Sequence, residues 1–421
     1  MTQVTKQNEL WAVAEQVEEK VAPYFKQAEQ IAYHNQEKVL AAFRHNRVSD
    51  FHLAGSTGYG YDDEGRDVLE RIYAETFGAE SCIVRGQIIS GTHAIAISLF
   101  GVLRPGDELL YITGEPYDTL ASIVSGGDQD TGSLKDYQIS YQHVDLCEDG
   151  TVDFEAVEKQ MKSNTKVVGI QRSKGYSDRP SFTIAEIEEM IQKVKAIDPN
   201  VIVFVDNCYG EFSETVEPTN VGADLMAGSL IKNPGGGLVR TGGYVAGRED
   251  LVKMCAFRMT SPGLGTEAGA SLDTLLEMYQ GFFLAPHVVS QAIKGAIFTA
   301  GLLDHFGMTT TPHYSAKRTD LIQSVSFGNA EQMIAFCQSI QENSPIDAHF
   351  APIPSYMPGY ADDVIMAAGT FIQGSSIELT ADGPIRPPYT AYVQGGLTYE
   401  HVKIAVLAST EKLIEKGLIT L

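Results

Sequence analysis

The stretch Gly222-Ala-Asp-Leu-Met-Ala-Gly-Ser-Leu-Ile-Lys-Asn-Pro-Gly-Gly-Gly237 places a single lysine, Lys232, among small and apolar residues. No other ionisable side chain lies between Asp224 and Arg240. A lysine that acts as a nucleophile must spend time as the neutral amine, and an apolar setting favours that form. The alternative is an ordinary lysine beside a glycine turn, with its charge carried to the surface. The partners of Lys232 decide between these interpretations.

The first partner lies upstream, where the apolar run Val201–Val205 is followed by Asp206. This pattern predicts a carboxylate at the C-terminal end of a buried strand, which is where open α/β sheets bind ligands. A carboxylate there can hold a pyridine nitrogen protonated, so that the ring accepts electrons. The alternative is an aspartate that caps the following turn.

The second partner is Ser90-Gly91-Thr92-His93, which follows a predicted strand and precedes the apolar helix 94–103. The first turn of a helix offers unpaired N–H groups and a positive dipole end, so this turn is a candidate anion site. Ser229, three residues before Lys232, adds a hydroxyl. An ordinary N-cap is the alternative for the serine.

The fold class follows from the alternation of short β-rich runs with amphipathic windows between about residues 80 and 250. It predicts an α/β fold with a seven-stranded, mostly parallel sheet. We expect an N-terminal helical arm at 1–50, a large α/β domain at 51–285 and a smaller C-terminal α+β domain at 286–421 that forms together with the N-terminal arm. The predicted elements of this smaller domain are helices at 288–303, 330–342 and 399–416 and strands at 376–379 and 390–394. The seven predicted strands are 81–85, 108–113, 138–144, 166–171, 201–206, 225–229 and 243–246.

Composition excludes several classes of protein. The 421 residues carry a formal net charge of −23, which argues against binding to nucleic acid or anionic membranes. No apolar run is long enough to span a bilayer and the N-terminus has no signal core, so we expect a cytoplasmic protein. The five scattered cysteines support neither a disulfide framework nor a zinc site, and we expect no bound metal.

Taken together, Asp206, Lys232, Ser229 and the Ser90–Thr92 turn resemble the site of fold-type I pyridoxal-phosphate (PLP) enzymes. The segment Leu69–Glu80 resembles the lyases of cysteine and methionine metabolism. The segments Arg85–His93 and Gly228–Gly237 are similar to a bacterial family of cystathionine β-lyase or methionine γ-lyase-like proteins linked to aluminium resistance. The resemblance implies PLP as cofactor and a carbon–sulfur lyase that acts on a sulfur-containing amino acid.

The resemblance also implies roles for individual residues. Lys232 would form the Schiff base with the cofactor and, with Tyr117, serve catalysis, while Asp206 would pair with the ring nitrogen. The phosphate would contact the turn at Ser90, Gly91 and Thr92 and also Ser229. Tyr117 or His93 would stack on the cofactor ring. Gln171 or Ser173 would face the ring hydroxyl. Arg386, or else Arg172, would bind the substrate carboxylate.

The resemblance also implies a Tyr-x-Arg pair that crosses a subunit interface to the cofactor phosphate of the partner. Tyr59-Gly-Tyr61 lies where this pair would fall, without the arginine, so Tyr59 or Tyr61 would contact that phosphate. A homodimer or homotetramer with active sites at the subunit interface is therefore expected. Two alternatives stay open: another PLP reaction at Cα, such as aldol cleavage, racemisation or transamination, or a non-catalytic metal-tolerance protein with an acidic surface.

Overall fold

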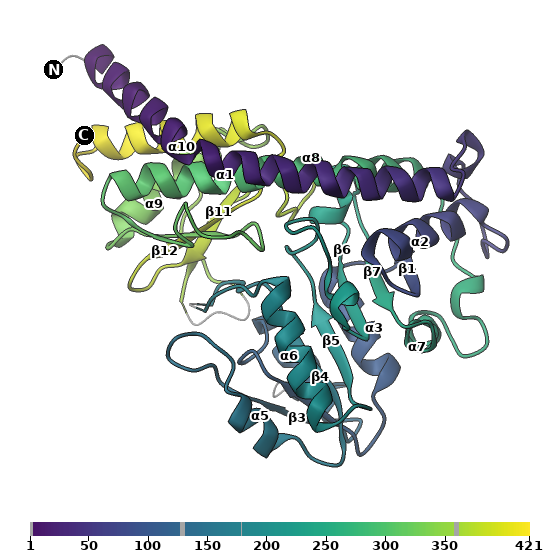
Figure 1. Cartoon of the computed structure of the whole chain (residues 1–421). Helices are drawn as coiled ribbons and strands as arrows, with labels where there is room; N and C mark the ends of the chain where they lie inside the picture. The colour runs from purple at the N-terminus through teal and green to yellow at the C-terminus, as the bar shows by residue number, and fades with distance from the viewer. Residues whose placement is uncertain (1–2, 127–130, 178, 358–361) are drawn as a thin grey trace. The chain divides into compact units, whose positions relative to one another are not determined.

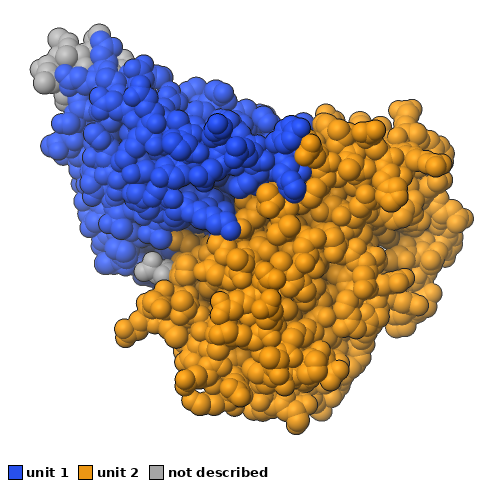
Figure 2. Space-filling view, in the orientation of Figure 1, with its two compact units in different colours: residues 1–34, 284–421 blue, residues 35–283 orange. Residues whose placement is uncertain are grey.

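The computed structural model describes residues 3–126, 131–177, 179–357 and 362–421. The chain forms two compact units, Asn35–Phe283 and Met1–His34 together with Leu284–Leu421 (Figure 2). The sequence-based division placed its boundaries after residues 50 and 285, whereas the units divide after residues 34 and 283. Two long helices, α1 (Gln3–His45) and α8 (Leu275–His305), contribute residues to both units.

Unit Asn35–Phe283 is built on a seven-stranded sheet in the order β1-β7-β6-β5-β4-β2-β3 (Figure 1). Strands β2 to β6 run parallel, and β7 is antiparallel to both β1 and β6. The predicted fold class is confirmed, as are all seven predicted strands to within two residues at each end. They are β1 (Ser81–Arg85), β2 (Glu108–Tyr111), β3 (Ser140–His143), β4 (Thr165–Gln171), β5 (Ile202–Asp206), β6 (Leu225–Ser229) and β7 (Gly243–Gly247).

Helices cover both faces of this sheet, which explains why its central strands are apolar throughout. Side chains alternate between the two faces along each strand. Ile202 and Phe204 of β5 pack in one cluster with side chains from α3 (Gly91–Val102) and α7 (Glu249–Met259). On β7, Tyr244 instead meets the aromatic rings of α2 (Glu64–Phe77). The central strands are therefore covered on both faces, and a site on them has to lie at the strand ends.

The remaining helices of this unit are short connections. Helix α6 (Ile184–Ile197) begins with a capping box in which Thr183 and Glu186 satisfy each other's backbone N–H groups. The others are α4 (Asp118–Ser125), α5 (Phe154–Gln160) and the 3₁₀ turns η1 (Asp50–Leu53), η2 (Pro218–Val221), η3 (Asn233–Gly235) and η4 (Gly265–Glu267).

The second unit holds an antiparallel sheet in the order β10-β11-β12-β9-β8. Its strands are β8 (Thr309–Thr311), β9 (Gln323–Ser326), β10 (Val364–Ala367), β11 (Thr380–Pro384) and β12 (Thr390–Gln394). Helices α9 (Ala330–Glu342) and α10 (Tyr399–Glu415) complete it, at the predicted positions. The predicted strand 376–379 is wrong: these residues form turns, and the strand starts at Thr380.

The register of this sheet gives it two unlike faces. Ala381, Val393 and Val325 lie on one face, and on that face a Cβ at Gly383 would come 2.9 Å from Met333 of α9. Thr380, Gln394 and Ser324 lie on the other face, which is polar although these residues are buried. Because β9 and β11 contain few large apolar residues, their sequences show no clear alternation of apolar and polar positions, and the sequence does not predict them as strands.

Gly169 in β4 tests the packing of the large sheet. A Cβ at this position would lie 2.8 Å from the ring of the buried Tyr111 on β2. We expect Gly169→Ala to cost about 1–3 kcal/mol through overpacking, seen as a lower apparent Tm in thermal unfolding. Gly86→Ala is the matched control, since a Cβ there would have its nearest neighbour at 3.6 Å. An unchanged Tm for Gly169→Ala would contradict the packing described.

Candidate active site

Lys232 lies just after β6, in the turn that leads into η3. Its Nζ is 3.9 Å from the centroid of the Tyr209 ring. The glycines that follow are needed for this turn: a Cβ at Gly235 would lie 1.7 Å from the carbonyl oxygen of Leu230, and Gly236 has a φ of 55°. The glycine-rich segment thus folds the chain back on itself and fixes where Lys232 emerges.

Asp206 ends β5, in register with Gln171 of β4 and Ala227 of β6. Its Oδ1 accepts a hydrogen bond of 3.1 Å from the backbone N–H of Cys208. Burial raises the pKa of Asp206, and the positive charge of Lys232 opposes that rise. The carboxylate and the lysine are thus within electrostatic reach of each other at neighbouring strand ends.

The pKa of Lys232 is raised, whereas the sequence led us to expect a lysine whose apolar setting favours the neutral amine. Burial does lower the pKa of Lys232, but Cys208, Tyr209, Asp206 and Tyr117 together raise it above its ordinary value. The surroundings of Lys232 therefore favour its ammonium form.

The N-terminus of α3 forms a cradle beside these two residues. Ser90 caps the helix, and its Oγ accepts a 3.0 Å hydrogen bond from the N–H of His93. A Cβ at Gly91 would lie 3.0 Å from Sγ of Cys208 and 3.3 Å from Cβ of Ser229. Glycine at position 91 therefore lets the first turn, with Thr92, approach the ends of β5 and β6. The Ser90 hydroxyl acts as a cap, which was its alternative role.

Two aromatic candidates differ in their relation to the lysine. Tyr117 is electrostatically coupled to Lys232, and its backbone N–H donates to Oε1 of Gln171 at 2.8 Å. His93 accepts a 3.2 Å bond at Nδ1 from the N–H of Ile89. Burial, aided by Arg258, lowers the pKa of His93, so its ring is neutral near pH 7. The coupling to Lys232 favours Tyr117 as the residue next to a ligand.

Gln171 and Ser173 are both buried and belong to one hydrogen-bonded turn. Nε2 of Gln171 donates to the carbonyl of Ser173 at 2.8 Å. Arg179, which the sequence did not single out, donates through Nη2 to the carbonyls of Gln171 at 2.9 Å and Ser173 at 2.5 Å. Arg179 also lowers the pKa of Asp206, so its charge belongs to the site.

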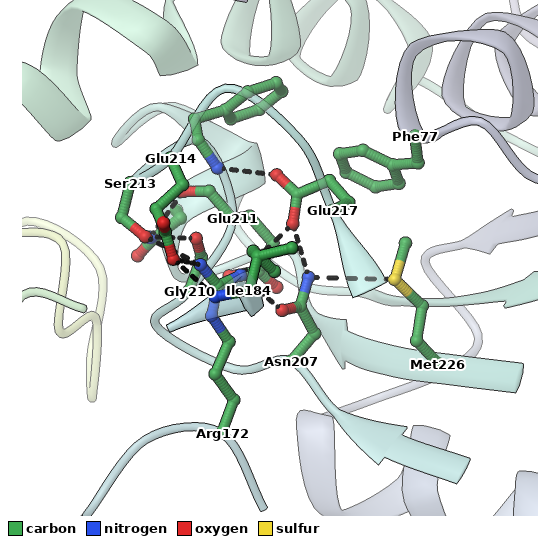
Figure 3. Close-up of polar contacts among 12 residues, drawn as sticks. Phe77, Arg172, Ile184, Asn207, Gly210, Glu211, Ser213, Glu214, Glu217 and Met226 are labelled. Carbon is green, nitrogen blue, oxygen red and sulfur yellow. Dashed lines mark hydrogen bonds and ion pairs between the residues drawn. The ribbon is translucent and has the colours of Figure 1, made fainter. Parts of the chain in front are cut away.

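The guanidinium of Arg172 lies in a buried polar network, which gives it a structural role (Figure 3); its role as a substrate ligand stays a prediction. Its side chain is 0% exposed. Nη1 donates to Oδ1 of Asn207 at 2.9 Å and to Oε2 of Glu217 at 3.3 Å. Nη2 donates to Oγ of Ser213 at 3.2 Å and to Oε1 of Glu214 at 3.3 Å. This guanidinium pins the loop that follows Asp206 and carries Tyr209.

The remaining candidates lie elsewhere. Tyr59 and Tyr61 stack on each other with centroids 5.3 Å apart and are 73% and 56% exposed, on a loop of unit Asn35–Phe283. Arg386 belongs to the other unit, where its exposed guanidinium is 3.4 Å from the Asp362 carboxylate. Their functional roles stay predictions. Among the described residues, no group of three or more His, Cys, Asp or Glu side chains could hold a metal ion, and no helix could cross a membrane.

Sequence reasoning missed the roles of Tyr209 and Glu211, although it quoted their segment. Tyr209 and Phe212 adopt positive φ values of 72° and 62°, which residues other than glycine rarely do and which no local pattern signals. Glu211 is fully buried, and its Oε1 accepts a 2.8 Å hydrogen bond from the hydroxyl of Tyr244. Burial raises the pKa of Glu211 to about 8, so its carboxyl is protonated at neutral pH.

The order of the seven strands, with the lysine after β6 and the aspartate at the end of β5, is the architecture of fold-type I PLP enzymes. The PLP-dependent protein YhfS from Escherichia coli shares the fold, with a TM-score of 0.61 at 15% identity over 93% of this chain and 97% of that one. More specifically, the chain belongs to the methionine γ-lyase family, whose model matches residues 10–414.

Relatives with high identity cover almost the whole chain. The uncharacterised protein YnbB of Bacillus subtilis is 65% identical over 407 residues, which is 96% of this chain and 97% of that protein. A structure from Listeria monocytogenes, provisionally described as a cystathionine β-lyase involved in aluminium resistance, has a TM-score of 0.95, 64% identity and coverage of 96% and 99%.

A third structure is described as a carbon–sulfur lyase involved in aluminium resistance from Clostridium novyi. It has a TM-score of 0.93 and 45% identity, over 98% of this chain and 100% of that one. The predicted resemblance to the aluminium-resistance lyases is confirmed.

Glu211 provides a test of the site's electrostatics. Its pKa rises from an ordinary value of 4.5 to about 8 on folding, so between these pH values the folded state binds one more proton than the unfolded chain. The stability gained from this proton is complete below pH 4.5 and is lost as the pH rises toward 8. We expect the unfolding free energy of the wild type to fall across this window by a few kcal/mol more than that of Glu211→Gln, measured by denaturant titration.

Glu148→Gln, at an exposed position, is the matched control and should keep the wild-type pH dependence. Parallel stability profiles for the wild type and Glu211→Gln would contradict the raised pKa.

Proposed function

We propose that the protein is a PLP-dependent carbon–sulfur lyase. It would eliminate a thiol from a sulfur-containing amino acid, as a cystathionine β-lyase or methionine γ-lyase does, and leave a 2-oxo acid and ammonia. The observation that carries the proposal is the electrostatic coupling of Lys232 and Asp206 at adjoining strand ends, beside the α3 cradle. Membership of the methionine γ-lyase family and the high-identity relatives support it.

The residues present fit the cofactor. PLP has an aldehyde, a ring nitrogen and a phosphate, and the site offers an amine, a buried carboxylate and a helix N-terminus in matching chemical roles. Gly91, Thr92 and Ser229 would hold the phosphate, Asp206 the ring nitrogen and Lys232 the aldehyde carbon. When bound, PLP supplies a ring that accepts the electron pair left after the Cα proton of an amino acid is removed.

Lys232 is the base in this proposal, and Asp206 is one of the groups that influence its protonation state. The Asp206 carboxylate contributes to the raised pKa of Lys232. If Asp206 paired with the ring nitrogen of bound PLP, its effect on Lys232 would weaken, and the neutral Nζ could then accept the Cα proton of the substrate. The Tyr209 ring, 3.9 Å from Nζ, limits the positions that the amine can occupy.

The position of the sulfur determines how many protons Nζ must move. With sulfur on Cβ, removal of the Cα proton is enough to expel the thiolate. With sulfur on Cγ, a Cβ proton must leave as well. Tyr117, which influences the pKa of Lys232, is the candidate to stack on the ring. Aldol cleavage, racemisation and transamination would use the same residues, and thiol release distinguishes the lyase from them.

Lys232→Ala tests the cofactor and the reaction together. We expect this variant to lose the visible absorbance of lysine-bound PLP and the borohydride-trapped adduct, and to release thiol about 10²–10⁴-fold more slowly, because the base is gone. Lys253→Ala, at an exposed position on α7, should behave as the wild type. A trapped adduct of undiminished yield in Lys232→Ala would overturn the assignment. Thiol and 2-oxo acid assays with cystathionine and with methionine separate β from γ elimination.

We also propose that a second copy of the chain covers the loop of Tyr59 and Tyr61 and that the active sites lie at this subunit interface. The loop pairs with another exposed segment: Gly269 donates to the carbonyl of Tyr59 at 2.8 Å, and Leu272, 58% exposed, donates to that of Ser56 at 3.0 Å. Exposed aromatic and aliphatic side chains in adjoining segments are typical of a protein interface.

Light scattering should therefore give a mass of two or four chains for the wild type. Tyr59→Asp should shift the distribution toward smaller species, because it would bury an unpaired charge in the interface. Ile197→Asp on α6 should leave the mass unchanged. A monomeric wild type would contradict the proposal.

A further inference from the structure

A polar cavity of about 300 Å³ lies in unit Asn35–Phe283, between α2, the start of β1 and η4. Helix α2 packs beside β1 (Figure 1). Strands β1 and β6 both pair antiparallel with β7, so they run parallel to each other. The start of β1 is therefore at the edge of the sheet opposite the strand ends that carry Asp206 and Lys232. The cavity is thus separate from the candidate active site.

Two nearly buried side chains of α2 reach this cavity with unbonded atoms. Arg66 is 3% exposed and Glu70 is 8% exposed, and as i and i+4 positions they lie on the same face of the helix. Among the residues that the structure describes, Nη2 of Arg66 and Oε2 of Glu70 have no hydrogen-bond partner. Neither atom is sealed in the interior, and both residues line the cavity.

The rest of each side chain is held in place. Nη1 of Arg66 donates to the carbonyl of Gly60 at 2.6 Å, and Oε1 of Glu70 accepts a bond of 2.6 Å from Nε of Arg85. Burial raises the pKa of Glu70, and both Arg85 and Arg66 oppose this rise, so Arg66 and Glu70 are within electrostatic reach of each other. The cavity therefore presents one charged donor and one charged acceptor at fixed positions, as a specific ligand site requires.

The charges around the cavity do not balance. Arg85 pairs with Glu70 at 2.6 Å without lining the cavity itself. With Arg85 included, three guanidinium groups meet four carboxylates, which leaves one negative charge. The carboxylate of Glu267 is exposed and makes no hydrogen bond or ion pair with a described residue. The charged residues that line the cavity are Arg66, Asp67, Glu70, Arg71, Glu80 and Glu267.

We infer that this cavity binds a basic amino acid such as lysine or arginine. Arg66 would hold the α-carboxylate, Glu70 the α-ammonium group and Glu267 the cation of the side chain. An α-amino acid carries an acceptor and a donor of opposite charge on one carbon, which matches the free donor and free acceptor on one face of α2. The second positive charge of the ligand balances the excess carboxylate. The inference does not depend on the proposed lyase function.

The test is calorimetric titration of the full chain with three probes. They are L-lysine, L-norleucine, which lacks the ammonium group of the lysine side chain, and cadaverine, which lacks the carboxylate. We expect lysine to bind, and the other two to bind about 10-fold more weakly, because each loses bonds to a charged group. The visible spectrum of the cofactor is followed in a parallel titration to report any binding at the active site.

Two variants probe the contacts of the ligand. Glu70→Gln should weaken lysine binding about 10-fold, as for a lost bond to a charged group. Glu267→Gln should weaken it about two- to fivefold, because an exposed ion pair is worth less, and should leave norleucine binding unchanged. Since Glu267 has no bond within the described chain, this variant tests the site even if Glu70→Gln folds poorly. Glu158→Gln, at an exposed position on α5, is the matched control and should bind lysine like the wild type.

Several results would overturn the inference. They are the absence of heat when lysine is added to the wild type, cadaverine binding as tight as lysine binding, or wild-type lysine binding in both variants. Heat that follows a change in the cofactor spectrum at every lysine concentration would assign the binding to the active site instead. A lower mass of Glu267→Gln in light scattering would assign the cavity to a basic side chain from a second copy of the chain.

Discussion

The structure depends most on the placement of one carboxylate and one amine at the open ends of two neighbouring parallel strands. Burial makes the ionised form of Asp206 costly, and the cation that offsets this cost comes from Lys232, one strand further along the sheet. Among the residues that the structure describes, neither side chain forms a salt bridge with a partner of opposite charge. The surrounding protein instead keeps both at fixed positions, through the glycine turn after Lys232 and the pinned loop after Asp206. A pair of this kind remains responsive to a third charge, which is what a cofactor ring nitrogen would provide.

Much of the large unit could be predicted from sequence because its signals are local. Runs such as Val201–Val205 are short, apolar and bounded by turn residues, and the capping serine at position 90 precedes an apolar helix in the usual way. The sheet of the second unit was harder, because one of its faces is polar and buried. Strands β8 and β9 carry threonine, serine and glutamine where a half-buried strand would alternate with apolar residues. No periodicity distinguishes such strands from loops.

The site shows the same division between local and long-range signals. Lys232, Asp206 and the α3 turn are each marked by their immediate neighbours in sequence. The buried Arg172 is not. It donates to acceptors more than thirty residues away, and nothing local distinguishes it from a ligand-binding residue. Contacts between residues that are far apart in the sequence can be read only from the structure. This is why the residues predicted to bind the substrate were the weakest part of the sequence-based interpretation.

The network around Arg172 limits how this protein can diversify. Its guanidinium, two carboxylates, an amide and a hydroxyl are all buried, so replacing any one of them leaves the others without compensation. Single substitutions in the loop that carries Tyr209 are therefore costly wherever they remove a member of this network, and the loop can change only when several buried positions change together.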